Sequence, residues 1–109
     1  MVRLDDILEK IRSYLPGADL DLVRKAYVFS AKVHQGQSRL SGEPYLTHPM
    51  EVAYILAQLR MDVPTVVTGL LHDALEDTLT TREEIQGVFG EEIASLVDGV
   101  TKIGKFFLR

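Results

Sequence analysis

Apolar residues recur at three- and four-residue steps along most of the chain, the spacing that places them on one face of an α-helix. This period predicts helices over about residues 4–15, 21–34, 48–59, 64–77, 82–89 and 91–103. Glycine, proline and short polar residues separate these segments. Because no strand pattern, internal repeat or low-complexity segment is found between them, the sequence predicts an all-α domain of about six helices.

Local signals support these boundaries. Pro16 and Gly17 end the first predicted helix, Thr81 and Glu84 form a capping box before the fifth, and Gly90 closes it. The third predicted helix carries the apolar residues Val52, Ile55, Leu56 and Leu59 at helical spacing. Residues 35–47 form a loop, and a loop of this length in a small domain is typical of a functional segment.

Four acid–base side chains interrupt the apolar surface of the fourth predicted helix. Because residues four apart share a helix face, we expect His72 beside Glu76 and Asp73 beside Asp77, in one polar patch. Ionisable groups among buried apolar residues need a partner, a hydrogen bond or a cation. The pattern suits a divalent metal and a water that must be activated. A solvated helix face with incidental charges is the alternative interpretation.

Two further histidines are candidates for the same site. Pro49 restricts the backbone of His48 at the start of the third helix, so His48 either completes a metal site or caps that helix. His34 lies on the inner face of the second helix. It is a candidate for a ligand or a substrate contact, but we favour a hydrogen-bonded core residue or a support for the ligands.

Composition narrows the classes of function. The 109 residues make one domain, and 46% hydrophobic residues suffice for a single core. A net charge of −4 without a dominant basic patch argues against a nucleic-acid partner. The absence of cysteine excludes disulfides, thiolate catalysis and cysteine-bound zinc, so His, Asp or Glu must hold any metal. With no membrane-length apolar run and no signal-peptide pattern, we expect a cytoplasmic protein without a membrane partner.

The final residues are apolar and lack a polar tail. This ending predicts a chain cut inside a longer protein, because natural domain ends are usually polar and exposed. We therefore expect an uncovered apolar face and self-association through it, at Val100, Ile103, Phe106 and Phe107.

Several motifs occur in a specific order, namely Lys32–Gln37, Ser41–Pro49, Gly69–Asp73 with Glu76–Thr78, and Val97–Lys102. In these motifs, from about residue 20 to its end, the chain resembles the N-terminal hydrolase region of RelA/SpoT-type proteins. The resemblance implies a helical bundle of the HD type. It also implies manganese-dependent removal of pyrophosphate from the 3′ position of ppGpp or pppGpp, leaving GDP or GTP, in stringent-response alarmone metabolism.

The resemblance also implies roles for single residues. The implied manganese ligands are His48, His72 and Asp73, with a fourth ligand, an aspartate, expected beyond Arg109. Glu76 and Asp77 are the implied groups that position and deprotonate the attacking water. Arg39 corresponds to the arginine that covers the guanine base, and Ser41 and Gly42 lie in the loop that shapes the nucleotide pocket. Leu40 departs from the lysine often found at its position.

Two other functions stay open. One is an HD phosphohydrolase that acts on another nucleotide, and the other is a non-catalytic regulatory module of the same fold. The retained His-Asp and Glu-Asp pairs favour a hydrolase in the parent protein. We expect the isolated 109-residue chain to bind metal weakly and to turn over little ppGpp, because its fourth ligand is missing.

Overall fold

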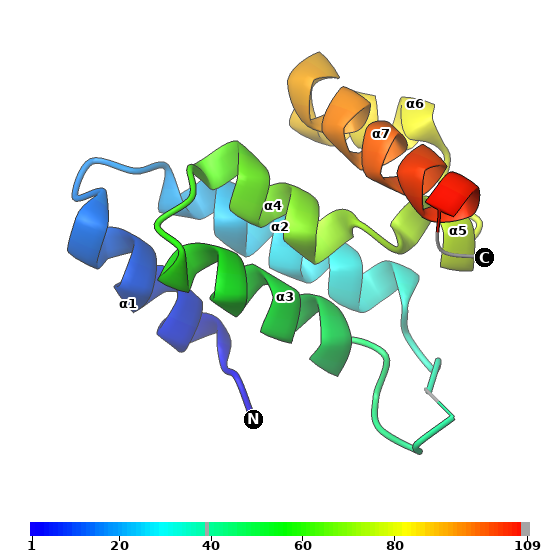
Figure 1. Cartoon of the computed structure of the whole chain (residues 1–109), viewed down its shortest axis with the longest axis horizontal. Coiled ribbons are helices and arrows are strands. Elements are labelled where there is room, and N and C mark those ends of the chain that lie inside the picture. The colour runs from blue at the N-terminus through cyan, green and yellow to red at the C-terminus, as the bar shows by residue number, and fades with distance from the viewer. Residues whose placement is uncertain (39, 108–109) are drawn as a thin grey trace.

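Helices make up the whole architecture that the structure shows (Figure 1). The structure is a computed structural model that describes residues 1–38 and 40–107, with side chains described as far as Ile103. Its elements are α1 (Leu4–Tyr14), α2 (Leu20–Val33), α3 (Thr47–Gln58), α4 (Val63–Leu71), α5 (Ala74–Asp77), α6 (Arg82–Phe89) and α7 (Glu91–Phe107). Within the described residues the only β pairing is an isolated bridge between Ser38 and Pro44. The predicted all-α class is confirmed.

The prediction of one continuous fourth helix was wrong. The chain forms two helices there, α4 and α5, and His72 and Asp73 separate them. His72 Nδ1 donates a hydrogen bond of 2.6 Å to the carbonyl oxygen of Gly69. In an unbroken helix that carbonyl would accept from the N–H of Asp73, so the histidine ring competes with the backbone pairing. The break gives seven helices instead of about six, and it sets the two residues of the His-Asp pair at a bend.

Helix α4 lies at the centre of the fold and packs against α2, α3 and α7 (Figure 1). Asp62 caps its start by accepting from the N–H of Thr65, and Pro64 follows in the first turn. Seven of its nine residues are buried, as expected for a helix that is apolar on all sides: Val63, Val66, Val67, Thr68, Gly69, Leu70 and Leu71. The His-Asp pair therefore comes directly after a helix that is almost entirely buried.

Gly69 lets α4 approach α3 closely. A Cβ atom at this position would lie 2.7 Å from Leu56 Cδ1 and 3.4 Å from Val52 Cγ1. Small residues on α3 help, since Ala53 and Ala57 are fully buried against the core. This approach places the start of α3 beside the end of α4.

The buried face of α3 consists of Pro49, Met50, Ala53 and Ala57. Of the apolar residues at helical spacing, Ile55 and Leu59 are 53% and 60% exposed. Leu56 is partly buried and packs against the core. Helical spacing alone therefore does not show which of these side chains face the core; the contact with α4 decides it.

The last two helices form a second packing unit beside α4 and α5 (Figure 1). The predicted capping box is confirmed, since Thr81 Oγ1 accepts from the N–H of Glu84 and the Glu84 side chain accepts from the N–H of Thr81. Gly90, at a φ of 94°, separates α6 from α7. No described helix has the length and apolar character needed to cross a membrane.

Candidate metal centre

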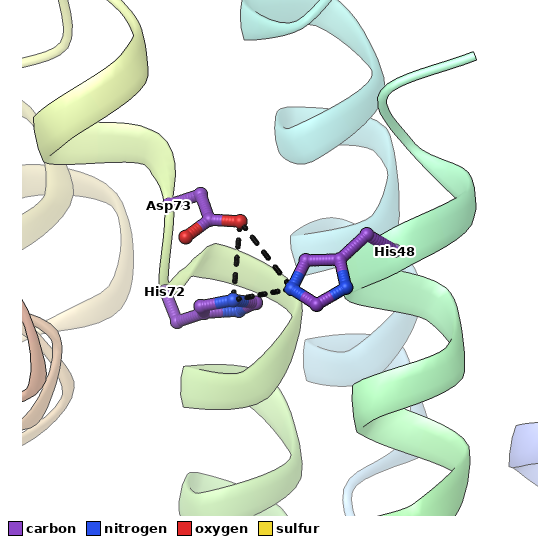
Figure 2. A group of neighbouring side chains, drawn as sticks. All are labelled: His48, His72 and Asp73. Carbon is purple, nitrogen blue, oxygen red and sulfur yellow. Dashed lines mark hydrogen bonds and ion pairs between the residues drawn. The ribbon is translucent and has the colours of Figure 1, made fainter. Parts of the chain in front are cut away.

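Three side chains converge where α3 begins and α4 ends (Figure 2). His48 lies in the first turn of α3, His72 directly follows α4, and Asp73 is the next residue. The two histidine Nε2 atoms are 3.3 Å apart, and Asp73 Oδ2 lies 3.1 Å from Nε2 of His72 and 3.8 Å from Nε2 of His48. Each residue offers one ligand atom, and these atoms lie within 4.8 Å of one another.

The hydrogen bond to Gly69 fixes which nitrogen of His72 is available. A carbonyl oxygen can only accept, so Nδ1 carries a proton and Nε2 of the neutral ring presents its lone pair to His48 and Asp73. Lone pairs and a carboxylate that face one another at these distances require a proton or a cation between them. A bond from the distal histidine nitrogen to a carbonyl is also a common second contact of metal-bound histidines. The donor set therefore fits a divalent transition-metal ion.

The charges of the cluster support one another. Burial lowers the pKa of His72, but its hydrogen bonds to Asp73 and Gly69 outweigh burial, and the charges of Asp73 and Asp77 add to them. The pKa of His72 is therefore raised. Burial raises the pKa of Asp73, but its hydrogen bond with His72 and the nearby histidine charges outweigh burial and leave that pKa lowered. Asp73 is held as a carboxylate, the form that binds a cation.

Glu76 and Asp77 lie on the single turn of α5, next to the triad but outside it. The N–H of Asp77 donates to the carbonyl oxygen of Asp73 at 2.9 Å, so these two residues remain one helical turn apart as expected. The expected alignment of His72 with Glu76 stays a prediction, since these two residues stand on either side of the break between α4 and α5. Both carboxylates border an open pocket of about 710 Å³ between α2 and the segment that follows α5.

Two residues for which the sequence predicts no individual role hold Asp77 in place. The Tyr45 hydroxyl donates to the Asp77 carboxylate, and Gln37 Nε2 donates to the Asp77 carbonyl oxygen at 3.0 Å. Both donors belong to the loop between α2 and α3 and stand inside the motifs noted above. The sequence signals that this loop matters, but nothing in its pattern shows that it reaches α5.

The predicted substrate residues lie in or near the same loop. Ser41 borders a pocket of about 620 Å³ together with Tyr45, His48 and Glu51. Gly42 has a φ of 89°, a left-handed conformation that favours glycine. Arg39 lies outside the described residues. Ser41 and His48 therefore share one pocket, as a substrate that reaches the triad would require.

Comparison with known proteins shows the family to which the chain belongs. Residues 26–106 match the model of a family described as HD domain. The chain is 62% identical over 96 residues (88% of its length) to a GTP pyrophosphokinase of Myxococcus xanthus. It is 51% identical over 104 residues (95%) to a guanosine-3′,5′-bis(diphosphate) 3′-pyrophosphohydrolase of Aquifex aeolicus. It is also 41% identical over 109 residues (100%) to the bifunctional (p)ppGpp synthase/hydrolase SpoT of Escherichia coli K12. The matched segments make up 13%, 15% and 16% of these three relatives.

Proposed function

This chain belongs to the HD domain family and, within it, to the RelA/SpoT type. From that premise we propose that it is the hydrolase domain of a protein that removes pyrophosphate from the 3′ position of ppGpp or pppGpp. We further propose manganese as its metal ion. Two of the relatives carry this hydrolysis in their names.

The convergence of His48, His72 and Asp73 is the observation that carries the proposal. His48 stands on α3, whereas His72 and Asp73 follow α4, and their ligand atoms meet because α3 and α4 pack closely at Gly69. A divalent ion held by them would acidify a water molecule and offset negative charge on the attacked phosphoryl group. This chemistry is what hydrolysis of a diphosphate at neutral pH needs.

The remaining steps fall to the carboxylates of α5. In the proposed reaction a new bond forms between water oxygen and the phosphorus attached to the ribose 3′ oxygen, and the bond between that phosphorus and the 3′ oxygen breaks. Asp77 or Glu76 accepts the proton that the water loses, and a proton is delivered to the 3′ oxygen as it leaves. Asp77 is the better placed base, because the Tyr45 hydroxyl holds its carboxylate and its charge reaches His72.

We assign the nucleotide to the pocket that Ser41 and His48 share. Ser41 and Gly42 would shape its wall, and Arg39 would cover the guanine base, a role that suits a planar guanidinium. This places the 3′ diphosphate at the triad. A fourth metal ligand outside these residues, a cytoplasmic location, domain boundaries at residues 1 and 109, and self-association remain predictions. Val100 and Ile103 are exposed as that last prediction requires, and the side chains of Phe106 and Phe107 lie outside the described residues.

The test uses the full-length protein, purified with its metal removed and then restored as Mn²⁺. We expect release of pyrophosphate and GDP from ppGpp, loss of activity with EDTA, and recovery with Mn²⁺. Deoxynucleoside triphosphates and cyclic dinucleotides serve as competing substrates in the same assay. Turnover of one of these in preference to ppGpp would identify a different HD phosphohydrolase. Metal binding without turnover of any of these nucleotides would favour a regulatory module.

A further inference from the structure

A buried histidine connects the two residues that hold Asp77. His34, directly after α2, is only 3% exposed. Its ring stacks on the Tyr45 ring at a centroid distance of 4.6 Å and an angle of 14°, and its Nδ1 lies 3.0 Å from Gln37 Oε1. Tyr45 and Gln37 are the residues whose side chains donate to Asp77. His34 therefore touches both supports of this carboxylate residue without contacting it.

The hydrogen-bond pattern fixes the protonation of this unit. The Asp77 carbonyl oxygen can only accept, so the Gln37 amide must turn its nitrogen toward it and its oxygen toward His34. The amide oxygen in turn accepts, so His34 Nδ1 must carry a proton. Nε2 of His34 is buried and has no hydrogen-bond partner. Burying a ring nitrogen without a partner costs stability, which a position with only a packing role would avoid by using an apolar residue.

Asp77 needs such support because its own helix supplies little. Helix α5 has four residues, too few to be stable by itself, and the Asp77 side chain is exposed. An unsupported carboxylate at this place would sample several rotamers. The ring stack ties Tyr45 to His34 at the end of α2, and the bond from the Tyr45 N–H to the Gln37 carbonyl oxygen at 3.1 Å ties it to Gln37 in the same loop.

We propose that His34, Tyr45 and Gln37 act as a positioning unit that holds Asp77 in its catalytic orientation. The inference rests on the proposed function, since Asp77 matters only if it acts on the attacking water. A general base loses efficiency when its geometry relaxes, even if substrate binding is unchanged. The unit should therefore affect kcat and leave KM nearly constant.

The first test compares Tyr45→Phe with Tyr14→Phe in the full-length protein. Each change removes one hydroxyl that bonds within the domain, but Tyr14 donates to the Met61 carbonyl oxygen, far from Asp77 in the sequence and in a separate contact. We expect Tyr45→Phe to lower kcat for ppGpp by roughly 10- to 100-fold with KM within about threefold, and Tyr14→Phe to leave both unchanged. A kcat within twofold of wild type for Tyr45→Phe, or a loss expressed only in KM, would overturn the proposal.

A second test asks whether the unit acts through Asp77. If it does, adding Tyr45→Phe to Asp77→Asn should lower kcat no further, whereas independent effects would multiply. His34→Phe keeps a ring for stacking but loses the donor to Gln37, and His34→Asn keeps a donor but loses the ring. We expect each to retain more activity than His34→Ala. Multiplying effects in the double variant would contradict the proposal.

Two readouts separate this inference from the proposed function. Wild-type turnover of ppGpp tests the function, and the ratio of variant to wild-type kcat tests the positioning unit. Nitrogen-15 spectra of the histidine rings add a measurement that needs no activity, in which His34 should carry its proton on Nδ1. A proton found only on Nε2 would contradict the arrangement, and equal metal content in all variants should exclude loss of the ion as the cause of slower turnover.

Discussion

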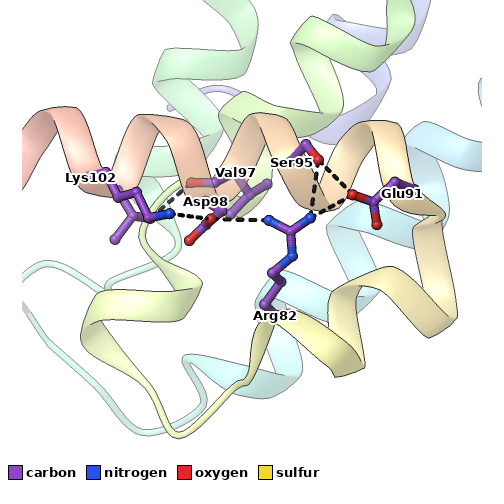
Figure 3. A network of polar contacts seen from close by, with 7 residues as sticks. Arg82, Glu91, Ser95, Val97, Asp98 and Lys102 are labelled. Atoms are coloured by element: carbon purple, nitrogen blue, oxygen red, sulfur yellow. Dashed lines mark hydrogen bonds and ion pairs between the residues drawn. The ribbon is translucent and has the colours of Figure 1, made fainter.

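Two polar clusters among the described residues, one at α6 and α7 and one at α3 and α4, differ in how far their own groups balance one another. In the cluster of α6 and α7, Arg82 donates to Asp98 at 3.0 Å, to Glu91 at 2.6 Å and to Ser95 at 3.1 Å (Figure 3). Lys102 adds a second cation on Asp98 at 3.0 Å. Two cations here face two carboxylates. In the cluster of His48, His72 and Asp73, the lone pair of His72 Nε2 faces the Asp73 carboxylate at 3.1 Å, so two acceptors meet and need a proton or a cation between them.

The difference shows what distinguishes a structural cluster from a candidate site. The Arg82 cluster is complete within the chain, and Arg82 and Lys102 hold the pKa of Asp98 below its usual range. Ion pairs that are at least partly exposed, as these are, stabilise a fold only slightly. In the triad, the His72 lone pair and the Asp73 carboxylate need a proton or a cation that these two groups do not supply to each other. A cluster of acceptors that needs such a cation is therefore the stronger indication of function.

The largest effect on activity is expected from Asp73→Ala, which removes the carboxylate of the triad. We expect ppGpp hydrolysis to fall to background, and the affinity for Mn²⁺ to drop by at least about 100-fold, because even an outer contact of a metal ligand is worth about 10- to 100-fold. Metal analysis and turnover of the full-length variant provide the check. Near-native turnover of ppGpp by this variant would contradict the assignment of the triad as the metal site.

Replacing the carboxylates of α5 separates holding a metal from accepting a proton. Asp77→Asn should lower kcat by roughly 10²- to 10⁴-fold with metal content nearly intact, since the amide keeps the shape but cannot take the proton. Glu76→Gln is the matched comparison on the same turn, and the contact of Asp77 with Tyr45 predicts the larger loss for Asp77. If a variant loses metal in proportion to its loss of activity, the replaced carboxylate is a metal ligand and not a general base.

Gly69→Ala tests whether the close approach of α3 and α4 builds the triad. The new Cβ meets the end of the Leu56 side chain at 2.7 Å, so this half-buried side chain must shift, and we expect that shift to offset the gain of about 1 kcal/mol from helix propensity. We expect lower stability by denaturant unfolding and weaker Mn²⁺ binding. Gly87→Ala in α6 is the control, because nothing lies within 4 Å of its Cβ and it should be neutral or stabilising. Unchanged metal affinity in Gly69→Ala would show that the close packing of α3 and α4 is not needed to build the metal site.

In the metal-free protein, the free energy of unfolding should depend on pH through the titration of the triad. The raised pKa of His72 gives stability that is full below about pH 6.5 and is lost as the pH rises through the folded-state value. The lowered pKa of Asp73 gives stability that is present above about pH 3.9 and is lost as the pH falls through its folded-state value. Denaturant unfolding in EDTA should therefore show highest stability between these limits. Asp73→Asn should flatten the decline above pH 6.5, and an unchanged profile would contradict the described contacts.

The smallest effect is expected from Arg82→Met, which opens the matched cluster. Since its ion pairs are at least partly exposed, we expect Tm to fall by less than about 4 °C and Mn²⁺ affinity to stay unchanged. High salt should reduce the difference from wild type. A loss of metal binding as large as that of Asp73→Ala would erase the distinction between the two clusters.

The sequence by itself predicted most of the helices, because apolar period and local caps act over a few residues. The start of α6 at Thr81 and the stop at Gly90 are examples, and both are confirmed. It also predicted the triad residues as candidates, since a His-Asp pair in an apolar run needs a partner. The same local rule failed at His72, where a side chain competes for a backbone carbonyl and ends the helix.

Only the tertiary structure decided which residues meet. Ala53 and Ala57 of α3 are fully buried, whereas Ile55 and Leu59 are exposed although they share the apolar period of the helix. The contact of Tyr45 with Asp77 joins a loop to a helix 32 residues later, and no periodicity encodes a pairing over that separation. Helical period reports the neighbours along one element. The meeting of elements depends on packing, which the whole chain determines together.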